Sequence, residues 1–140
     1  MDTHWFGEIP NPDKYYGFTY LIINTTNDRK YVGKKAYKIK RRRPPLKGRR
    51  RRRTYYGESN WKIYTGSSEE LNRDIKRLGK DNFKFIILSQ CKTKSGLYYQ
   101  EVVELVLRHA VVLSEYYNYT IPAVRFKPKI DCTHEQSSDN

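Results

Sequence analysis

The run between Lys38 and Arg53 constrains this chain more than any other feature, because it contains eleven Lys and Arg residues. No acidic residue occurs between Asp28 and Glu58, so these charges have no partners nearby in the sequence. A Pro-Pro pair and a glycine within the run interrupt regular structure. A segment this basic cannot enter a hydrophobic core. We therefore predict an inserted loop or partly ordered arm over residues 38–58, within an otherwise folded domain.

The charge of the whole chain points to a polyanionic partner. Its 140 residues include 28 Lys and Arg against 15 Asp and Glu, a net charge of +13. The hydrophobic share of 37% and aromatic share of 14% indicate one folded domain instead of a disordered basic tail. Nucleic acid is the expected partner, since each neutralised phosphate releases a counterion. A membrane is disfavoured, because no long apolar segment is present and the basic run is not amphipathic.

The two cysteines, Cys91 and Cys132, have no CxxC spacing and no His or Cys cluster beside them, which argues against a zinc site. One possible pair does not make a disulfide framework. The N-terminus lacks the basic and apolar regions of a signal peptide. We expect an intracellular, cytoplasmic protein with both thiols reduced.

The first half of the chain predicts a β-hairpin. Gly17–Ile23 is rich in β-branched and aromatic residues and predicts a strand. Thr25–Asp28 has turn composition, and Lys30–Gly33 is the returning strand. If the loop between the strands holds an even number of residues, Tyr20 and Tyr31 lie on the same face.

The second half predicts a helix, a buried strand and another helix. Ser67 with Glu70 three residues later forms a capping box, and Gly79 is placed to end that helix. Phe83–Leu88 is an apolar run that predicts a strand buried on both faces. A second helix is expected from about Gly96 to Ser114.

This order of elements predicts a small mixed α/β domain, with a short antiparallel sheet of about three strands flanked by helices. The domain is expected over residues 15–125. Residues 1–14 contain two prolines and form a loose lead-in. Residues 126–140 form a polar tail, which we expect to be frayed from Asp131 onward.

Five motifs follow one another along this domain. The first two are Gly17-Phe18-Thr19-Tyr20 and Tyr31-Val32-Gly33-Lys34-Lys35, whose tyrosines are eleven residues apart. The others are Trp61-x-x-Tyr64-x-Gly66-Ser67-Ser68, Gly79-x-x-Asn82-Phe83, and Tyr99-x-Glu101 followed by Tyr117-Asn118. The pattern resembles the GIY-YIG nucleases, in particular the phage-encoded homing endonucleases of the Seg type. The first motif is relaxed, and the second has Val in place of Ile.

The resemblance implies an endonuclease that hydrolyses phosphodiester bonds in DNA with a divalent cation, Mg²⁺ first and Mn²⁺ as the alternative. In that family a helical glutamate holds the metal, a tyrosine activates water and an arginine steadies the phosphate. Cleavage of a phosphodiester requires these functions on physical grounds as well. The implied roles are Tyr20 as general base, Tyr31 in assisting it or orienting water, Glu101 as metal ligand, Arg41 as phosphate ligand and Asn118 in fixing local geometry. A tyrosine is a poor base at neutral pH, and we expect Lys34, Lys35 and the metal to favour its phenolate.

Several of these residues have ordinary alternatives. Glu104 lies one turn beyond Glu101 on nearly the same helix face, and either carboxylate could simply be solvated. Asn118 directly follows the second helix, where Asn often serves as a cap. We expect Trp61 and Tyr64 to pack beneath the insertion and not to stack bases.

The arginine assignment is the least sharply defined, because Arg42 and Arg43 adjoin Arg41. Most of the insertion is expected to grip phosphates without reading sequence. The predicted nucleic-acid-binding residues are Lys34, Lys35, Arg42, Arg43, Lys47, Arg49, Arg50, Arg51, Arg52 and Arg53.

Two other functions are compatible with the sequence. One is a non-catalytic basic module whose tyrosines stack bases, although such a module needs no carboxylate beside them. The other is a restriction or repair nuclease on the same fold. The chain has no separate recognition domain, so a protein partner or a second copy of the chain is expected to add any specificity that the insertion lacks.

Overall fold

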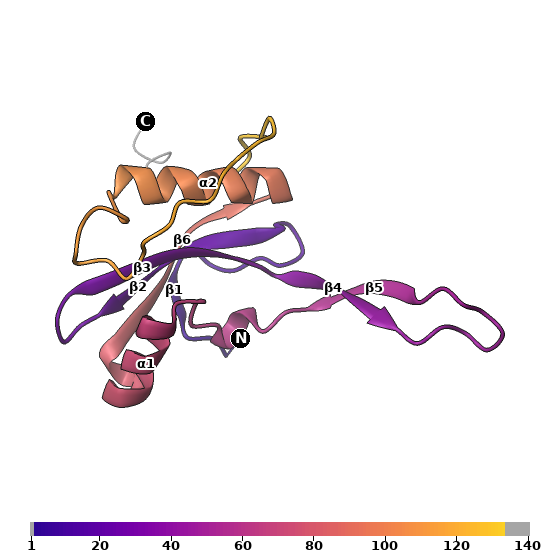
Figure 1. The fold of residues 1–140 in the computed structure, drawn as a ribbon, viewed down its shortest axis with the longest axis horizontal. Coiled ribbons are helices and arrows are strands. Elements are labelled where there is room, and N and C mark those ends of the chain that lie inside the picture. The colour runs from indigo at the N-terminus through magenta and orange to yellow at the C-terminus, as the bar shows by residue number, and fades with distance from the viewer. Residues whose placement is uncertain (1, 134–140) are drawn as a thin grey trace.

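The computed structural model describes residues 2–133, which form a four-stranded sheet with one α-helix on each face and a protruding hairpin (Figure 1). The strands of the sheet are β1 (Trp5–Gly7), β2 (Gly17–Asn24), β3 (Arg29–Ala36) and β6 (Phe83–Cys91). The hairpin consists of β4 (Lys38–Arg43) and β5 (Arg53–Glu58). The helices are α1 (Glu69–Leu78) and α2 (Lys94–Leu107), with short 3-10 turns η1 (Trp61–Ile63) and η2 (Lys80–Asn82).

The sheet is mixed, with the order β1-β6-β2-β3. We expected about three antiparallel strands; β2, β3 and β6 are antiparallel, but β1 adds a fourth strand parallel to β6. β1 arises from the expected lead-in, with Trp5 opposite Phe85. Trp5 is buried and its indole N–H donates to the carbonyl of Trp61. These long-range contacts order a segment whose local composition predicts a loop.

The predicted pairing of the first two strands is confirmed. Tyr20 lies opposite Gly33, and Ile22 lies opposite Tyr31. The two tyrosines therefore share one face of the sheet. Asp28 takes a left-handed conformation, with φ of 61°, in the turn between the strands.

Side chains alternate between two cores along β2, as its period of two requires. Phe18, Tyr20 and Ile22 point to the α1 face, where they pack with Trp5, Tyr37, Trp61, Leu71, Phe83, Phe85 and Ile87. Leu21 points to the α2 face, with Val32, Leu88, Leu105 and Ala110. Both faces of the central strands are covered, so β6 is a buried strand, as predicted.

The helix boundaries differ from the prediction at two points. α1 is capped by Ser68, whose hydroxyl accepts from the Leu71 N–H at 3.2 Å, and not by Ser67. Gly79 ends α1 as predicted, with φ of 95°. α2 ends at Leu107, seven residues before the expected Ser114, because His109 adopts a left-handed conformation.

The predicted basic loop is largely a β-hairpin. The register runs from Lys38 opposite Glu58 to Arg43 opposite Arg53. Only residues 44–52 connect the strands as a loop. The hairpin extends away from the sheet and helices (Figure 1), so its ladder hydrogen bonds, and not a hydrophobic core, hold it together.

Two expectations about the C-terminal part are wrong. Cys91 and Cys132 are joined by a disulfide, a pairing that their separation of 41 residues hides in the sequence. Residues 131–133 are not frayed: the Thr133 N–H donates to the Gln90 carbonyl at 2.8 Å, and Cys132 bridges to Cys91 at the end of β6. The rest of the expected frayed tail, residues 134–140, lies outside the described residues.

Candidate active site

Three tyrosines meet on the α1 face of the sheet, and we call them the tyrosine cluster: Tyr20, Tyr31 and Tyr64. The ring centroid of Tyr20 is 6.2 Å from that of Tyr31 and 6.2 Å from that of Tyr64. Tyr20 is central and only 1% exposed, whereas Tyr31 and Tyr64 are half-buried. The cluster is therefore built around one fully buried phenol.

Two glycines make room for these rings. A Cβ on Gly33 would overlap the phenol of Tyr20, which crosses over that residue. A Cβ on Gly66 would approach Tyr31 Cε2 to 2.9 Å and Tyr20 Oη to 3.3 Å. Gly66 also has φ of 85°, a conformation that favours glycine. The segment before α1 can therefore lie directly against both tyrosines.

Polar groups border the cluster. The hydroxyls of Tyr31 and Ser67 are 3.1 Å apart. Lys35 Nζ lies 4.1 Å from the centroid of the Tyr64 ring, and burial lowers the pKa of this lysine. An amine held against an aromatic face at the rim of a buried site is well placed to meet an anion.

Glu101 approaches from α2, which covers the opposite face of the sheet (Figure 1). The residue is 8% exposed, and its carboxylate accepts from Lys34 Nζ at 3.1 Å. Glu104 behaves differently, since its carboxylate accepts from Arg108 at 3.0 Å and from Gln100 at 3.2 Å. Of the two carboxylates that the sequence leaves open, the geometry favours Glu101.

The electrostatics couple Glu101 to the tyrosine cluster. Burial raises the pKa of Tyr20 well above its ordinary value, and Tyr31, Tyr64 and Glu101 add to the rise. Burial and the same glutamate also raise the pKa of Tyr64. Burial and these neighbours therefore favour the neutral phenol form of Tyr20, and a phenolate would need a further positive charge beside it.

Glu101 is the candidate ligand for a hard divalent cation, and its carboxylate is paired with Lys34. Within residues 2–133 no three His, Cys, Asp or Glu side chains converge on a metal position. Mg²⁺ needs no such cage, because it is commonly held by one or two carboxylates together with water and substrate phosphate oxygens. Glu101 can supply one such carboxylate.

Asn118 has a clear positioning role. Its side-chain amide donates to the Val32 carbonyl at 2.8 Å and accepts from the Val32 N–H at 2.9 Å. Asn118 thus pairs with the outer edge of β3, between Tyr31 and Gly33. These two hydrogen bonds tie the segment after α2 to β3.

Arg41 lies on β4, away from the cluster, and its guanidinium donates to the Glu58 carbonyl at 3.1 Å. No contact found within residues 2–133 joins it to the three tyrosines or to Glu101. The other basic residues of the insertion lie on the hairpin or its connecting loop: Arg42, Arg43, Lys47, Arg49, Arg50, Arg51, Arg52 and Arg53. Of the predicted nucleic-acid-binding residues, only Lys34 and Lys35 border the site.

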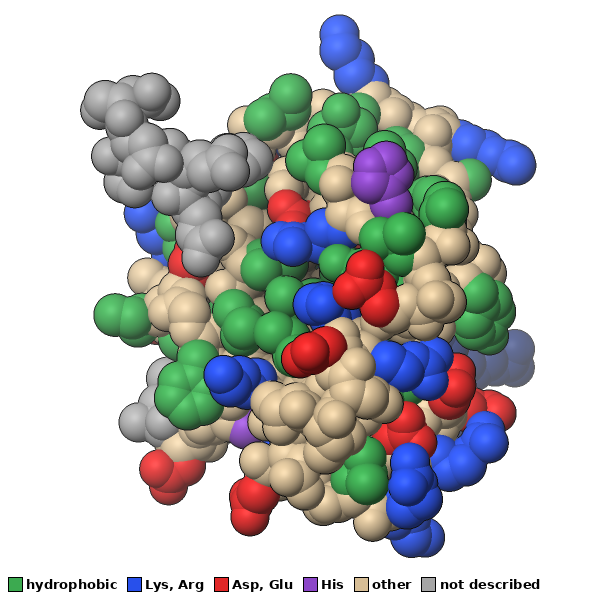
Figure 2. Space-filling view, turned by 90° about the vertical axis from the view of Figure 1, so that its left-hand side faces the viewer, with side chains coloured by type: hydrophobic (Ala, Val, Ile, Leu, Met, Phe, Trp, Pro, Cys, Tyr) green, Lys and Arg blue, Asp and Glu red, His purple; other side chains and the backbone are tan. Residues whose placement is uncertain are grey.

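Charge is distributed unevenly over the molecule. The end away from the hairpin, seen in Figure 2, shows acidic and basic side chains interspersed. Ion pairs such as Arg29–Glu70 and Lys30–Glu115 neutralise much of the charge on the other basic residues. The excess of positive charge is concentrated at the hairpin. No helix of the described part is long and apolar enough to cross a membrane.

Sequence reasoning missed two members of the site. Tyr64 was expected to pack beneath the insertion but adjoins Tyr20, whereas Trp61 does enter the core. Gly66 had no assigned role, although it contacts both catalytic candidates. The Tyr64-x-Gly66 spacing is the signal that could have identified them. It places an aromatic ring and a residue without a side chain two positions apart, just before the helix.

The comparisons with known proteins agree with this geometry. Residues 5–121 match the family model described as “Putative endonuclease segE, GIY-YIG domain”. The matched range spans every strand and helix of the domain, including the hairpin. Searches of the curated proteins and of the solved structures gave no significant match.

Proposed function

This chain belongs to the segE-type GIY-YIG family, and we propose that it is a divalent-cation-dependent endonuclease that hydrolyses phosphodiester bonds in DNA. The observation that carries the proposal is the placement of Glu101. This nearly buried carboxylate lies close enough to the tyrosine cluster to raise the pKa of Tyr20. A protein that only binds DNA has no need to bury a carboxylate beside a group of phenols.

Glu101 would hold the cation, with Mg²⁺ as the first candidate and Mn²⁺ as the second. When bound, such a cation neutralises charge on the phosphate and lowers the pKa of coordinated water. Lys34 Nζ already lies 3.1 Å from the Glu101 carboxylate, so a cation bound there would share or displace this ion pair.

Tyr20 and Tyr31 would handle the proton of the attacking water. Burial raises the pKa of Tyr20, so it would act as a base only where a positive charge nearby favours its phenolate. Tyr31 is more exposed and shares a hydrogen bond with Ser67, which suits it to orienting the water. A tyrosine that accepts this proton in the transition state contributes roughly 10²- to 10⁴-fold to the rate.

Lys35 is the best-placed cation for the scissile phosphate, since it borders the cluster on the same face. Arg41 can reach that phosphate only if the hairpin folds toward the cluster when DNA binds. The exposed hairpin arginines would instead hold DNA on either side of the cut. Recognition of a long site, as in homing, would draw on the hairpin or on a partner, which includes a second copy of the chain.

The test is plasmid cleavage by the purified protein with Mg²⁺, with Mn²⁺ and with excess chelator. We expect nicked or linear DNA with either metal and none with chelator. A restriction or repair nuclease would pass the same test, and substrates with and without lesions would separate these roles. DNA binding without cleavage under every metal condition would overturn the proposal and favour a non-catalytic DNA-binding protein.

A further inference from the structure

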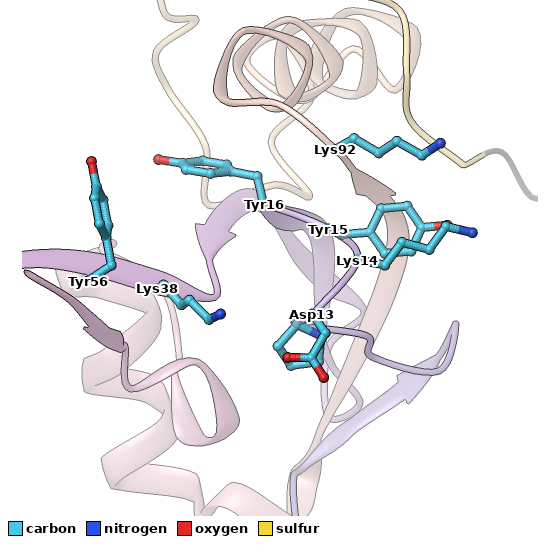
Figure 3. Close-up of a pocket in the computed structure, with 8 residues that line it drawn as sticks. Asp13, Lys14, Tyr15, Tyr16, Lys38, Tyr56 and Lys92 are labelled. Atoms are coloured by element: carbon cyan, nitrogen blue, oxygen red, sulfur yellow. The ribbon is translucent and has the colours of Figure 1, made fainter.

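A second site lies at the root of the hairpin, apart from the tyrosine cluster. It is a cleft of about 380 Å³ between the start of β2, the end of β6 and the first residues of the hairpin (Figure 3). The lining residues are Pro12, Asp13, Lys14, Tyr15, Tyr16, Lys38, Tyr56 and Lys92. Three lysines, three tyrosines and one acid therefore surround one open space, which we call the lysine–tyrosine cleft.

Two of the tyrosines present their rings to this space from different elements. In Figure 3 the Tyr16 side chain extends from the start of β2 toward Tyr56 on β5. Tyr56 is 69% exposed and has no core role. Burial raises the pKa of Tyr16, and its neighbours Tyr98 and Tyr56 add to the rise, as expected for rings that lie close together. Exposed aromatic faces beside lysines are the usual platform for bases outside a duplex.

The cleft also connects with the proposed catalytic residues. Tyr98, which neighbours Tyr16, lies under Lys34 Nζ at 4.3 Å from its ring centroid. Lys34 in turn contacts Glu101. A series of neighbouring side chains thus leads from the carboxylate of Glu101 to the cleft, through Lys34, Tyr98 and Tyr16. One DNA strand could follow this series.

We propose that the lysine–tyrosine cleft binds one unpaired nucleotide of the DNA substrate, an inference that rests on the proposed function. Its base would stack on Tyr16 and Tyr56, and Lys14, Lys38 and Lys92 would meet the flanking phosphates. A paired base does not fit this description, because its neighbours in the duplex already cover both of its faces. A nuclease that holds such a nucleotide would prefer DNA that is locally opened beside the cut.

Asp13 adds a preference for the base. It is the acid among the lining residues, and a carboxylate accepts hydrogen bonds without donating any. Adenine, cytosine and guanine carry an exocyclic amino group that can donate to it, whereas an unpaired thymine offers only its single ring N3–H. The cleft should therefore favour an unpaired adenine over an unpaired thymine.

The hairpin offers a matched control. Tyr56 lies opposite Lys40 in the register, and Tyr55 lies opposite Arg41, so the two rings point to opposite faces. Tyr55 is covered by Arg43, whose guanidinium is 4.1 Å from its ring centroid, and does not line the cleft. Tyr56→Leu and Tyr55→Leu each remove one phenol ring, from adjacent positions.

The experiment measures binding in excess chelator, by fluorescence anisotropy of labelled duplexes of about 20 base pairs. One duplex is fully paired and the other carries a single unpaired adenine. We expect the unpaired adenine to improve affinity about tenfold, as one stacked base does. Tyr56→Leu should abolish this gain and Tyr55→Leu should keep it. Equal affinity of the wild-type protein for both duplexes, or equal effects of the two substitutions, would overturn the proposal.

A third duplex with an unpaired thymine tests Asp13. It should bind more weakly than the adenine duplex, and Asp13→Asn should reduce this difference. Equal binding of the adenine and thymine duplexes by the wild-type protein would overturn the role of Asp13. Because the cation is absent throughout, the result does not depend on cleavage: a protein that never cuts DNA can still show the nucleotide site, and an active nuclease can lack it.

Discussion

The phenol of Tyr20 lies directly over Gly33 on the neighbouring strand, so closely that a Cβ at position 33 would overlap it. The two residues are paired in the register of β2 and β3. Tyr20 reaches Tyr31 and Tyr64 only because Gly33 has no side chain. Gly33, in the second motif, therefore makes room for the ring of Tyr20, in the first motif.

Gly33→Ala should destabilise the protein by about 1–3 kcal/mol, the usual cost of overpacking a filled core. Chemical denaturation measures the change. Gly57→Ala is the control, because it is also a strand glycine but its Cβ would meet the flexible side chain of Arg41 at 3.1 Å and the Tyr55 ring at an ordinary contact distance of 3.4 Å. Adding Tyr20→Leu should recover part of the loss at Gly33. Strictly additive effects of the two substitutions would show that they do not interact.

Tyr20→Phe should fold normally and cleave DNA about 10²-fold more slowly or worse. The pKa of Tyr20 is raised, so its phenolate is scarce at neutral pH and increases with pH. If Tyr20 is the base, the single-turnover rate of the wild-type protein should rise with pH, and the variant should lose that rise. Parallel pH profiles for the two proteins would assign the base to another group.

His4 should make stability depend on pH. Its ring stacks on Phe85 with centroids 3.9 Å apart, and its Nε2 donates to the Tyr64 carbonyl at 3.0 Å. Burial, with help from Lys80, lowers the pKa of His4 to about 4. The unfolded chain, with a histidine pKa near 6.5, therefore binds the proton more readily, and stability falls as the pH drops from about 6.5 to 4.

For a fully buried group this pKa shift would change the free energy of unfolding by ~3 kcal/mol. Solvent screening of the partly exposed His4 ring reduces that change to about 1–2 kcal/mol. Unfolding free energies measured at pH 7 and pH 4 test the effect. His4→Phe should lose less stability between these values than the wild-type protein. His109→Asn, at an exposed left-handed position, should lose as much as the wild type. A wild-type loss no larger than that of His4→Phe would rule out His4 as the source.

The connecting loop of the hairpin should supply salt-dependent affinity. Replacing Arg49–Arg53 with Ser should weaken binding to all DNA sequences alike. It should also flatten the slope of log K against log salt by up to about four units, if every arginine meets a phosphate. Replacing Lys76 and Lys80, exposed on and after α1, is the control and should leave the slope nearly unchanged. Loss of preference for one sequence at an unchanged slope would show that the arginines read bases.

The sequence predicted the parts of the fold that depend on local patterns. The shared sheet face of Tyr20 and Tyr31, the strand β6 and the glycine at the end of α1 follow from periodicity and turn chemistry. It missed β1, because a three-residue parallel strand is stabilised by Trp5 contacting distant residues. The hairpin was hidden because β4 is nearly all Lys and Arg, so neither strand shows the polar and apolar alternation typical of a half-buried strand.

The candidate site also has features that the sequence predicts and features that depend on long-range packing. The resemblance to a known family brought Tyr20, Tyr31 and Glu101 to attention. The ring centroids of Tyr20 and Tyr31 are 6.2 Å apart, and Glu101 is among the groups that raise the pKa of Tyr20. Neither the burial of Tyr20 nor the ion pair of Glu101 with Lys34 can be deduced from spacing. The burial of Tyr20 depends on the packing of the α1 face, and the ion pair depends on how α2 packs on the opposite face. Arg41 was predicted from its spacing in sequence after Tyr31. The basic insertion disturbs that spacing.

Glu101 is the proposed metal ligand, and Glu104 provides its control on the same helix. Both carboxylates are partly buried and ion-paired, but only Glu101 acts on the tyrosine cluster. The measurement is the single-turnover cleavage rate with saturating Mg²⁺ and saturating DNA, for Glu101→Gln and Glu104→Gln, with DNA binding measured in parallel. We predict that Glu101→Gln binds DNA but cuts at least about 10²-fold more slowly, while Glu104→Gln stays within a few-fold of the wild type. Normal cleavage by Glu101→Gln, with or without loss in Glu104→Gln, would contradict the assignment of the metal site.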